Sequence, residues 1–222
     1  MDENVTAIVP AFNEGDSIEE TIYALKQIKG ITEIIAVNDG SSDNTLNILK
    51  YIENIKLINI DRNHGKGYAI KVALPHVMNQ YVVLVDADLK SSALEIKKLV
   101  EYSPTTNKTM IVAVYPKPSK KGGFGLVKLL SRKSLYILTS QTSDSVLSGQ
   151  RLASLDFLKQ INLPDRFGLE FKITLEALRS DINIIDVPIN IRHRETGRNI
   201  QGFIHRGKQF VNILKVVVRE LI

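Results

Sequence analysis

The sequence predicts an α/β protein in which a mostly parallel β-sheet is flanked by helices. Short apolar stretches alternate with amphipathic helical stretches through the first hundred residues. Polar clusters follow three of the apolar stretches, at residues 13–14, 38–39 and 86–88. Because parallel strands end at the same edge of a sheet and ligands gather beyond that edge, the three clusters predict one shared site.

Four consecutive strand-and-helix units make up the first half of the chain. We expect strands at residues 5–10, 34–37, 56–60 and 81–85. The first three helices are indicated by apolar residues three and four positions apart. These residues are Ile18, Ile22, Leu25 and Ile28, then Leu46, Leu49 and Ile52, then Ile70, Ala73, Leu74 and Val77.

The second half is less regular, with strands expected at residues 110–114, 147–152 and 184–191. Pro188 lacks a backbone N–H, so it predicts that the last of these is an edge strand or contains a bulge. Two further helices are indicated by apolar residues on one face: Phe171, Leu175, Leu178 and Ile182, then Phe210, Leu214, Val217 and Leu221. Without an internal repeat or a linker, residues 1–222 are expected to form a single domain.

Composition narrows the classes of partner. The chain has 222 residues, 44% of them apolar, which suffices for a sizeable core, and its net charge of +5 favours anionic partners. The absence of cysteine excludes disulfides, zinc–thiolate sites and thiol nucleophiles. Aromatic residues make up only 6% and are not interleaved with basic ones, so we do not expect nucleic-acid binding.

Membrane-spanning and targeting segments are not expected. The longest apolar stretches fall short of the roughly 20 residues that a membrane span requires. A charged and then apolar leader does not open the chain. We therefore expect a cytoplasmic protein that works at the inner face of the cell membrane if it contacts lipid.

The end of the fourth strand carries two acidic residues, Asp86 and Asp88. Mg²⁺ and Mn²⁺ take oxygen ligands, shared between one or two carboxylates, waters and substrate phosphates. Isolated acidic residues also serve as turn formers and helix caps. The other polar clusters at the same edge favour a divalent metal held against a diphosphate.

Three segments in this order resemble the family 2 glycosyltransferases. They are residues 9–14, 37–43 and 86–88, which read VPAFNE, VNDGSSD and DAD. The resemblance covers roughly residues 4–115 and implies the GT-A fold, which is the Rossmann-like fold of nucleotide-diphospho-sugar transferases, together with inversion at the anomeric carbon. It implies a nucleotide-sugar-binding half at about 1–115 and an acceptor-binding half with a C-terminal helix at about 116–222.

The resemblance also implies roles for single residues in the nucleotide pocket. Pro10, Ala11 and Phe12 would line the base pocket, and Glu14 would approach the ribose. Asp39 would accept a hydrogen bond from the base edge, which suits an ionised carboxylate because it can only accept. The alternative for Asp39 is a turn residue that caps the next helix.

Donor phosphate and metal are assigned in the same way. Asp86 and Ala87 would lie near the nucleotide, with Asp88 on Mg²⁺ or Mn²⁺. Residues 63–69, which read NHGKGYA, are similar to a segment of the polyprenyl- and dolichyl-phosphate sugar transferases of the same family. Glycines let the backbone approach a ligand, and Lys66 supplies a point charge for phosphate, although an ordinary turn before a helix stays an alternative.

The second half resembles those transferases more loosely, at residues 148–151, 166–170 and 187–198. His193 resembles the histidine that completes the metal site in some relatives, and a surface histidine is the alternative. Arginine binds phosphate oxygens bidentately. The residues assigned to the acceptor or its phosphate are Gln150, Arg151, Arg194 and Arg198.

The implied reaction is a single displacement by the acceptor oxygen at the anomeric carbon of a UDP- or GDP-sugar, a hexosyl transfer. A hydroxyl acceptor needs a general base, and Glu170 or Asp144 are the candidates. A phosphate-bearing or lipid-linked acceptor is already anionic and needs none, and it is the acceptor we expect. Transfer to a soluble hydroxyl, a sugar-nucleotide pyrophosphorylase and a non-catalytic nucleotide-binding regulatory module remain alternatives.

Two segments of the second half have more than one interpretation. Residues 117–133 are basic and include apolar positions, which predicts an amphipathic helix on a membrane surface or an ordinary helix with a solvated basic face. The apolar run at 213–218 could pack on the core, on lipid, or on a second copy in a homodimer.

Overall fold

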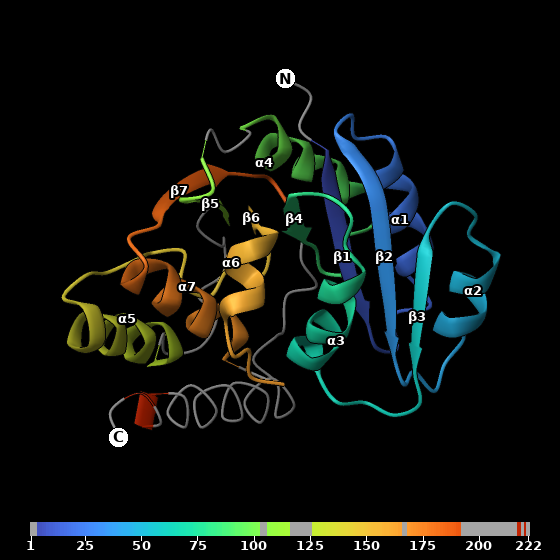
Figure 1. Ribbon diagram of the computed structural model, residues 1–222. Helices are drawn as coiled ribbons and strands as arrows, with labels where there is room; N and C mark the ends of the chain where they lie inside the picture. The colour runs from blue at the N-terminus through green and yellow to red at the C-terminus, as the bar shows by residue number, and fades with distance from the viewer. Residues whose placement is uncertain are drawn as a thin grey trace.

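A single mixed sheet organises the molecule (Figure 1). The computed structural model describes residues 4–102, 106–115, 126–165, 168–191, 217–218 and 220. In these parts, seven strands lie in the order β3-β2-β1-β4-β6-β5-β7. Their bounds are β1 Val5–Ala11, β2 Ile31–Asp39, β3 Lys56–Ile60, β4 Tyr81–Leu84, β5 Thr109–Val114, β6 Arg151–Ser154 and β7 Asn183–Pro188.

Strand pairing brings the predicted polar clusters to one edge. β1 pairs in parallel with both β2 and β4, and β2 with β3. β6 runs antiparallel to β4 and β5, so its first residue, Arg151, lies across from Leu84 at the end of β4. The carboxyl ends of β1, β2 and β4 and the start of β6 therefore share an edge, which confirms the mostly parallel sheet.

Helices cover both faces of the sheet (Figure 1). On one face lie α1 (Ile18–Lys26), α2 (Thr45–Tyr51) and α4 (Lys97–Glu101), the last entered through the 3₁₀ helix η2 (Lys90–Ile96). On the other lie α3 (Lys66–Ala73), with the 3₁₀ turn η1 (Leu74–His76), α6 (Leu155–Gln160) and α7 (Leu169–Arg179). β1 separates the two cores because alternate side chains point to opposite faces: Ala7 and Val9 join one cluster and Ile8 the other.

A third, smaller cluster lies outside the sheet, between α5 (Leu126–Thr139) and α7. Leu135 of α5 packs there with Phe171 and Leu175 of α7, and Val217 near the C-terminus joins them. The helix predicted within the basic stretch is thus confirmed for its second part, while residues 117–125 lie outside the described residues. No helix in the described ranges is both long and apolar enough to cross a membrane.

The structure corrects several predicted boundaries, and β2, at Ile31–Asp39, is longer at both ends than the strand expected at 34–37. The strand expected at 147–152 begins only at Arg151, because Ser148 N–H donates to the carbonyl of Ser145 in a turn before it. The helix expected around Ile70 begins earlier, at Lys66, because Gly65 adopts a φ of 105° that ends the preceding loop. β7 ends at Pro188 on the outer edge of the sheet, so the edge strand inferred from that proline is confirmed.

Candidate active site

The loops after β1 and β2 hold each other through side chains of the first two motifs. Asn13 Oδ1 accepts the backbone N–H of Ser42 at 2.8 Å, and Glu14 N–H donates to Thr45 Oγ1 at 2.8 Å. Asp43 accepts the N–H groups of Gly15 and Thr45, both at 3.0 Å. Burial opposes the charge of Asp43, but these hydrogen bonds outweigh it and lower its pKa. Much of the shape of this edge is therefore built by the motif residues themselves.

The predicted base pocket lies at the end of β1. Ala11 is buried, Pro10 and Glu14 are half-buried, and Phe12 is 44% exposed. The Glu14 carboxylate accepts a hydrogen bond from Ser17 Oγ at 2.7 Å. An exposed phenyl ring at a strand end offers a face on which a base can stack. The roles of these residues toward a nucleotide stay predictions.

Asp39 is buried at the end of β2, where it fixes the turn before α3. Its two carboxylate oxygens accept the backbone N–H groups of His64 at 2.9 Å and Gly65 at 2.7 Å. A carboxylate that binds two successive amides holds their loop in one conformation. Asp39 thereby positions the following residue, Lys66, and its assignment to the base edge stays a prediction.

Lys66 joins the two halves of the chain. It is the first residue of α3, and its Nζ lies 2.6 Å from Asp86 Oδ1 and 3.0 Å from Glu170 Oε1. Asp86 follows β4, and Glu170 lies in the first turn of α7. Burial disfavours the ammonium, but the charges of Asp86 and Glu170 outweigh burial and raise the pKa of Lys66. The ammonium thus stays charged at neutral pH, between two carboxylates.

A second chain of hydrogen bonds reaches Asp86 from the opposite side. Gln150 Nε2 donates to Asp86 Oδ2 at 2.6 Å, and the Tyr115 hydroxyl donates to Gln150 Oε1. Burial raises the pKa of Tyr115 to about 12, so this hydroxyl keeps its proton. A Cβ added at Gly149 would lie 2.6 Å from Asp86 Oδ2, so a larger residue there would displace the carboxylate from this position.

This arrangement corrects the assignment of Gln150 to the acceptor. Its side chain is fully buried, and both ends of its amide bond within the protein. Its effect on any ligand is therefore indirect, through the orientation of Asp86.

Arg151 is corrected in the same way. Its side chain is only 1% exposed because it opens β6 in the interior of the sheet. The guanidinium donates to the carbonyls of Ser148 and Glu170 and to Thr174 Oγ1, each at 3.2 Å. Burial lowers the pKa of Arg151 to about 10, so it remains charged at neutral pH. It anchors the first turn of α7 and does not face an acceptor.

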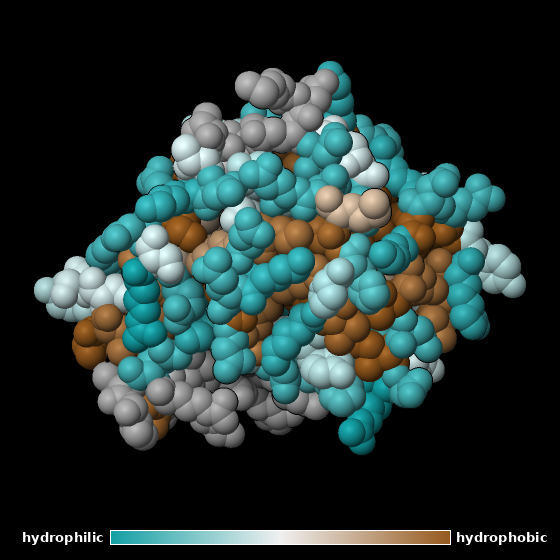
Figure 2. Space-filling view, in the orientation of Figure 1, coloured by the Kyte–Doolittle hydropathy of each residue, from teal (hydrophilic) through white to brown (hydrophobic). Residues whose placement is uncertain are grey.

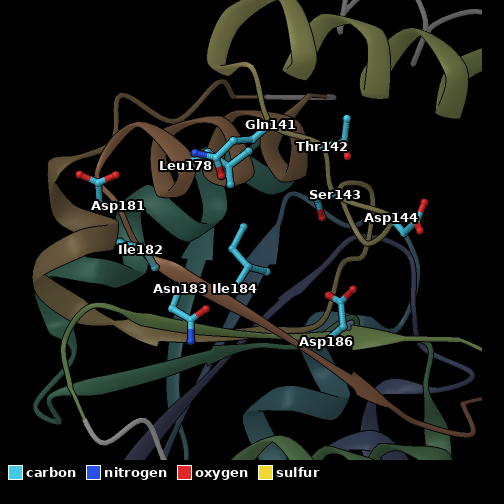
Figure 3. Close-up of a pocket in the computed structure, with 10 residues that line it drawn as sticks. All are labelled: Gln141, Thr142, Ser143, Asp144, Leu178, Asp181, Ile182, Asn183, Ile184 and Asp186. Carbon is cyan, nitrogen blue, oxygen red and sulfur yellow. The ribbon is translucent and has the colours of Figure 1, made fainter.

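Lys66, Asp86 and Glu170 together form the Lys66 cluster, and Asp144 lies apart from it. Its carboxylate is 67% exposed and pairs with Arg132 of α5 at 3.0 Å. It lines a polar pocket of about 560 Å³, which lies between β7 and the loop that follows α5 (Figure 3). Asp181 and Asp186 line the same pocket. The residues that line this pocket do not include Lys66, Asp86 or Glu170. Of the two candidate bases, the structure brings only Glu170 to the cluster.

The model of glycosyl transferase family 2 matches residues 6–164. The chain belongs to glycosyl transferase family 2. A dolichyl-phosphate β-glucosyltransferase of Trichomonas vaginalis is 35% identical to it, over 96% of this chain and 73% of the relative. An undecaprenyl-phosphate 4-deoxy-4-formamido-L-arabinose transferase of Pectobacterium carotovorum is 36% identical over 46% of this chain and 34% of the relative. The chain thus spans about a third of that relative's length.

Solved structures place this family 2 glycosyltransferase in the GT-A fold. Glucosyl-3-phosphoglycerate synthase from Mycobacterium tuberculosis, solved with Mn²⁺, uridine diphosphate and glucosyl-3-phosphoglycerate, superposes with a TM-score of 0.79. The match covers 97% of this chain and 80% of that one, at 21% sequence identity. Likeness at that identity establishes the shared fold.

The oxygen donors of the glycosyltransferase fit a divalent metal that shares its ligands with a substrate. Within the described ranges, no three His, Asp or Glu side chains form a group that could hold an ion by themselves. Mg²⁺ and Mn²⁺ need only one or two carboxylates where diphosphate and water supply the other ligands. Asp88, half-buried directly beyond β4, fits that part. His193, Arg194 and Arg198 lie outside the described residues.

Sequence reasoning missed Tyr115 and the pairing of Lys66 with Glu170. Tyr115 is the first residue after β5, so the rule that found Asp39 and Asp86, polar residues just beyond strand ends, would have selected it too. The contact between Lys66 and Glu170 spans 104 positions, and no local pattern in the sequence indicates it.

Proposed function

We propose that this glycosyltransferase moves a sugar from a nucleoside diphosphate donor to a phosphate-bearing, lipid-linked acceptor, with inversion at the anomeric carbon. The observation that carries the proposal is the Lys66 ammonium, held between Asp86 of the first half and Glu170 of the second. A charged group where both halves meet is suited to two anionic substrates that must approach each other.

On the donor side, the ammonium of Lys66 is a compact charge that suits diphosphate oxygens. Asp88 would hold a divalent metal together with the diphosphate, and the metal would neutralise charge on the leaving group. Gln150 and Tyr115 keep the Asp86 carboxylate in one orientation beside Lys66. Because these groups are fixed before the donor binds, little reorganisation is needed during the reaction.

On the acceptor side, a phosphate oxygen is ionised near neutral pH and can attack without a general base. The Lys66 ammonium, 3.0 Å from Glu170, is the charge that would attract such an anion. Relatives that use dolichyl phosphate and undecaprenyl phosphate support an acceptor of this class.

A second candidate is transfer to a hydroxyl group, with Glu170 as the base. It is favoured by the Glu170 carboxylate, which lies at the cluster 3.0 Å from Lys66. The Glu170 carboxylate is already in contact with the Lys66 ammonium, and it would have to give up that contact to accept a proton from an acceptor hydroxyl. We therefore place this candidate second.

The two candidates differ in the acceptor they need. UDP- and GDP-sugars are incubated with Mn²⁺, the enzyme and either a polyprenyl phosphate or the matching polyprenol in detergent. We expect sugar on the phosphate acceptor alone, one nucleoside diphosphate released for each sugar transferred, and transfer retained in Glu170→Gln. Transfer to polyprenol that Glu170→Gln abolishes would establish the hydroxyl mechanism instead.

A further inference from the structure

The outward face of α5 exposes large apolar side chains that do not belong to any of the three hydrophobic clusters. Leu129, Tyr136 and Ile137 are 52%, 60% and 70% exposed. They fall on one half of the helix, since 3.6 residues make a turn. The other large apolar side chains exposed in the described ranges are spread over separate elements. Among these ranges, α5 is therefore the element on which exposed apolar side chains are concentrated. Figure 2 shows hydrophobic side chains reaching the surface at α5, beside strongly hydrophilic ones.

Basic residues share that half of the helix. Lys128, Arg132 and Lys133 are all exposed, and α5 contains no acidic residue between Leu126 and Thr139. The opposite half, with Leu135, packs against α7 and anchors the helix. The α5 docking face is defined as Lys128, Leu129, Arg132, Lys133, Tyr136 and Ile137.

We infer that the α5 docking face binds the surface of an anionic lipid bilayer. Leucine, isoleucine and tyrosine side chains enter the boundary between head groups and acyl chains, while neighbouring lysines and arginines contact lipid phosphates. The inference rests on the proposed function, because a lipid-linked acceptor presents its phosphate at such a surface.

A second copy of the chain fits this face less well. A twofold contact would bring Lys128, Arg132 and Lys133 of both copies into one interface, where α5 offers no acidic residue and like charges repel. An anionic surface meets the same charges with attraction, which the net charge of +5 reinforces at long range.

The docking face is mechanically connected to the active site. α5 packs along α7 through Leu135, Phe171 and Leu175, and the first turn of α7 carries Glu170. A bilayer bound by α5 is therefore held in a fixed relation to the Lys66 cluster, through one packed pair of helices.

Vesicle sedimentation tests the inference without substrates. The full chain is mixed with phosphatidylcholine vesicles, with or without added phosphatidylglycerol and free of polyprenyl phosphate. One variant combines Lys128→Glu with Lys133→Glu, and another Leu129→Ser with Ile137→Ser. The matched control combines Lys50→Glu with Lys97→Glu, exposed lysines of α2 and α4 that change the net charge equally.

We expect the wild type and the control to sediment with anionic vesicles, less so at high salt. The charge variant should bind roughly a hundredfold more weakly and the apolar variant roughly tenfold more weakly, with unchanged melting temperatures. Equal binding by the α5 variants and the wild type would overturn the inference. The inference would also be overturned if the wild type did not sediment with anionic vesicles, or if it formed a dimer that the α5 variants abolish.

Turnover on a short, water-soluble polyprenyl phosphate tests the proposed function separately. The α5 variants should keep this activity, because the face does not contribute to the Lys66 cluster. If the wild type bound anionic vesicles but transferred sugar to no phosphate acceptor, the result would count against the proposed function alone.

Discussion

Both carboxylate oxygens of Asp86 accept hydrogen bonds, one from Lys66 and the other from Gln150. The hydroxyl of Tyr115 determines which end of the Gln150 amide faces Asp86. Donation from Tyr115 to Gln150 Oε1 leaves the amide nitrogen of Gln150 facing Asp86 Oδ2. Without that hydroxyl the amide can turn over and present its oxygen to the carboxylate, which repels it. In the proposed function, Tyr115 is a positioning residue that acts on the donor through Gln150 and Asp86.

Tyr115→Phe should lower kcat/KM roughly five- to tenfold, since one buried hydrogen bond contributes about 1 kcal/mol. The loss should appear mainly in the KM for the donor, and the melting temperature should fall by only about 2–4 °C. Tyr81→Phe is the matched control, because it removes a buried hydroxyl bound to Asn107 at the far end of β4. Equal kinetics in the two variants would rule out the positioning role.

Single residues also show where sequence reasoning stops. Asp86 was selected because it follows a strand, and Lys66 and Glu170 because their segments resemble those of related transferases. The structure brings the three side chains together. Gln150 and Arg151 were assigned to an acceptor because residues 148–151 resemble a segment of related transferases, and both are buried. Burial depends on what packs over a residue, and one sequence does not contain that information.

At the scale of elements, α7 ties the second half together. Its Lys172 and Arg179 pair with Glu220 near the C-terminus, and Lys172 also binds Glu176 at 2.7 Å. Burial raises the pKa of Glu220, but the two basic groups outweigh it and lower the pKa below the ordinary value. A carboxylate with a depressed pKa stabilises the fold at pH values above the unfolded pKa.

Glu220→Gln should therefore lower the free energy of unfolding at pH 7 by about 1 kcal/mol. The difference from wild type should shrink as the pH falls below 4.5, the ordinary pKa of glutamate, and vanish below the folded pKa. Denaturant unfolding at several pH values measures it, with Glu101→Gln, an exposed residue of α4, as the control. A difference that is independent of pH would refute an ionic contribution.

At the scale of the whole molecule, the first half was predictable because its information is local. Apolar spacing marked β1 to β4 and the helices between them, and strand ends indicated the edge that carries the site. In the second half, β6 runs antiparallel between β4 and β5, a pairing of distant segments without a local pattern. The strand there was accordingly predicted four residues too early.

In the proposed function, the Lys66 cluster binds the diphosphate of a sugar donor together with a divalent metal. Titration calorimetry of UDP, GDP, CDP and dTDP, with and without Mn²⁺, measures this in the wild type, Asp88→Asn and Lys66→Met. Lys71→Met is the matched control, since Lys71 lies on the same helix and pairs with Asp165 at 2.5 Å.

We predict that one diphosphate binds in the presence of Mn²⁺, and that Asp88→Asn removes the metal dependence. Lys66→Met should weaken binding tenfold or more, about 1.4 kcal/mol, while Lys71→Met binds as the wild type does. Equal affinity in Lys66→Met and Lys71→Met, with no effect of metal, would contradict the claim.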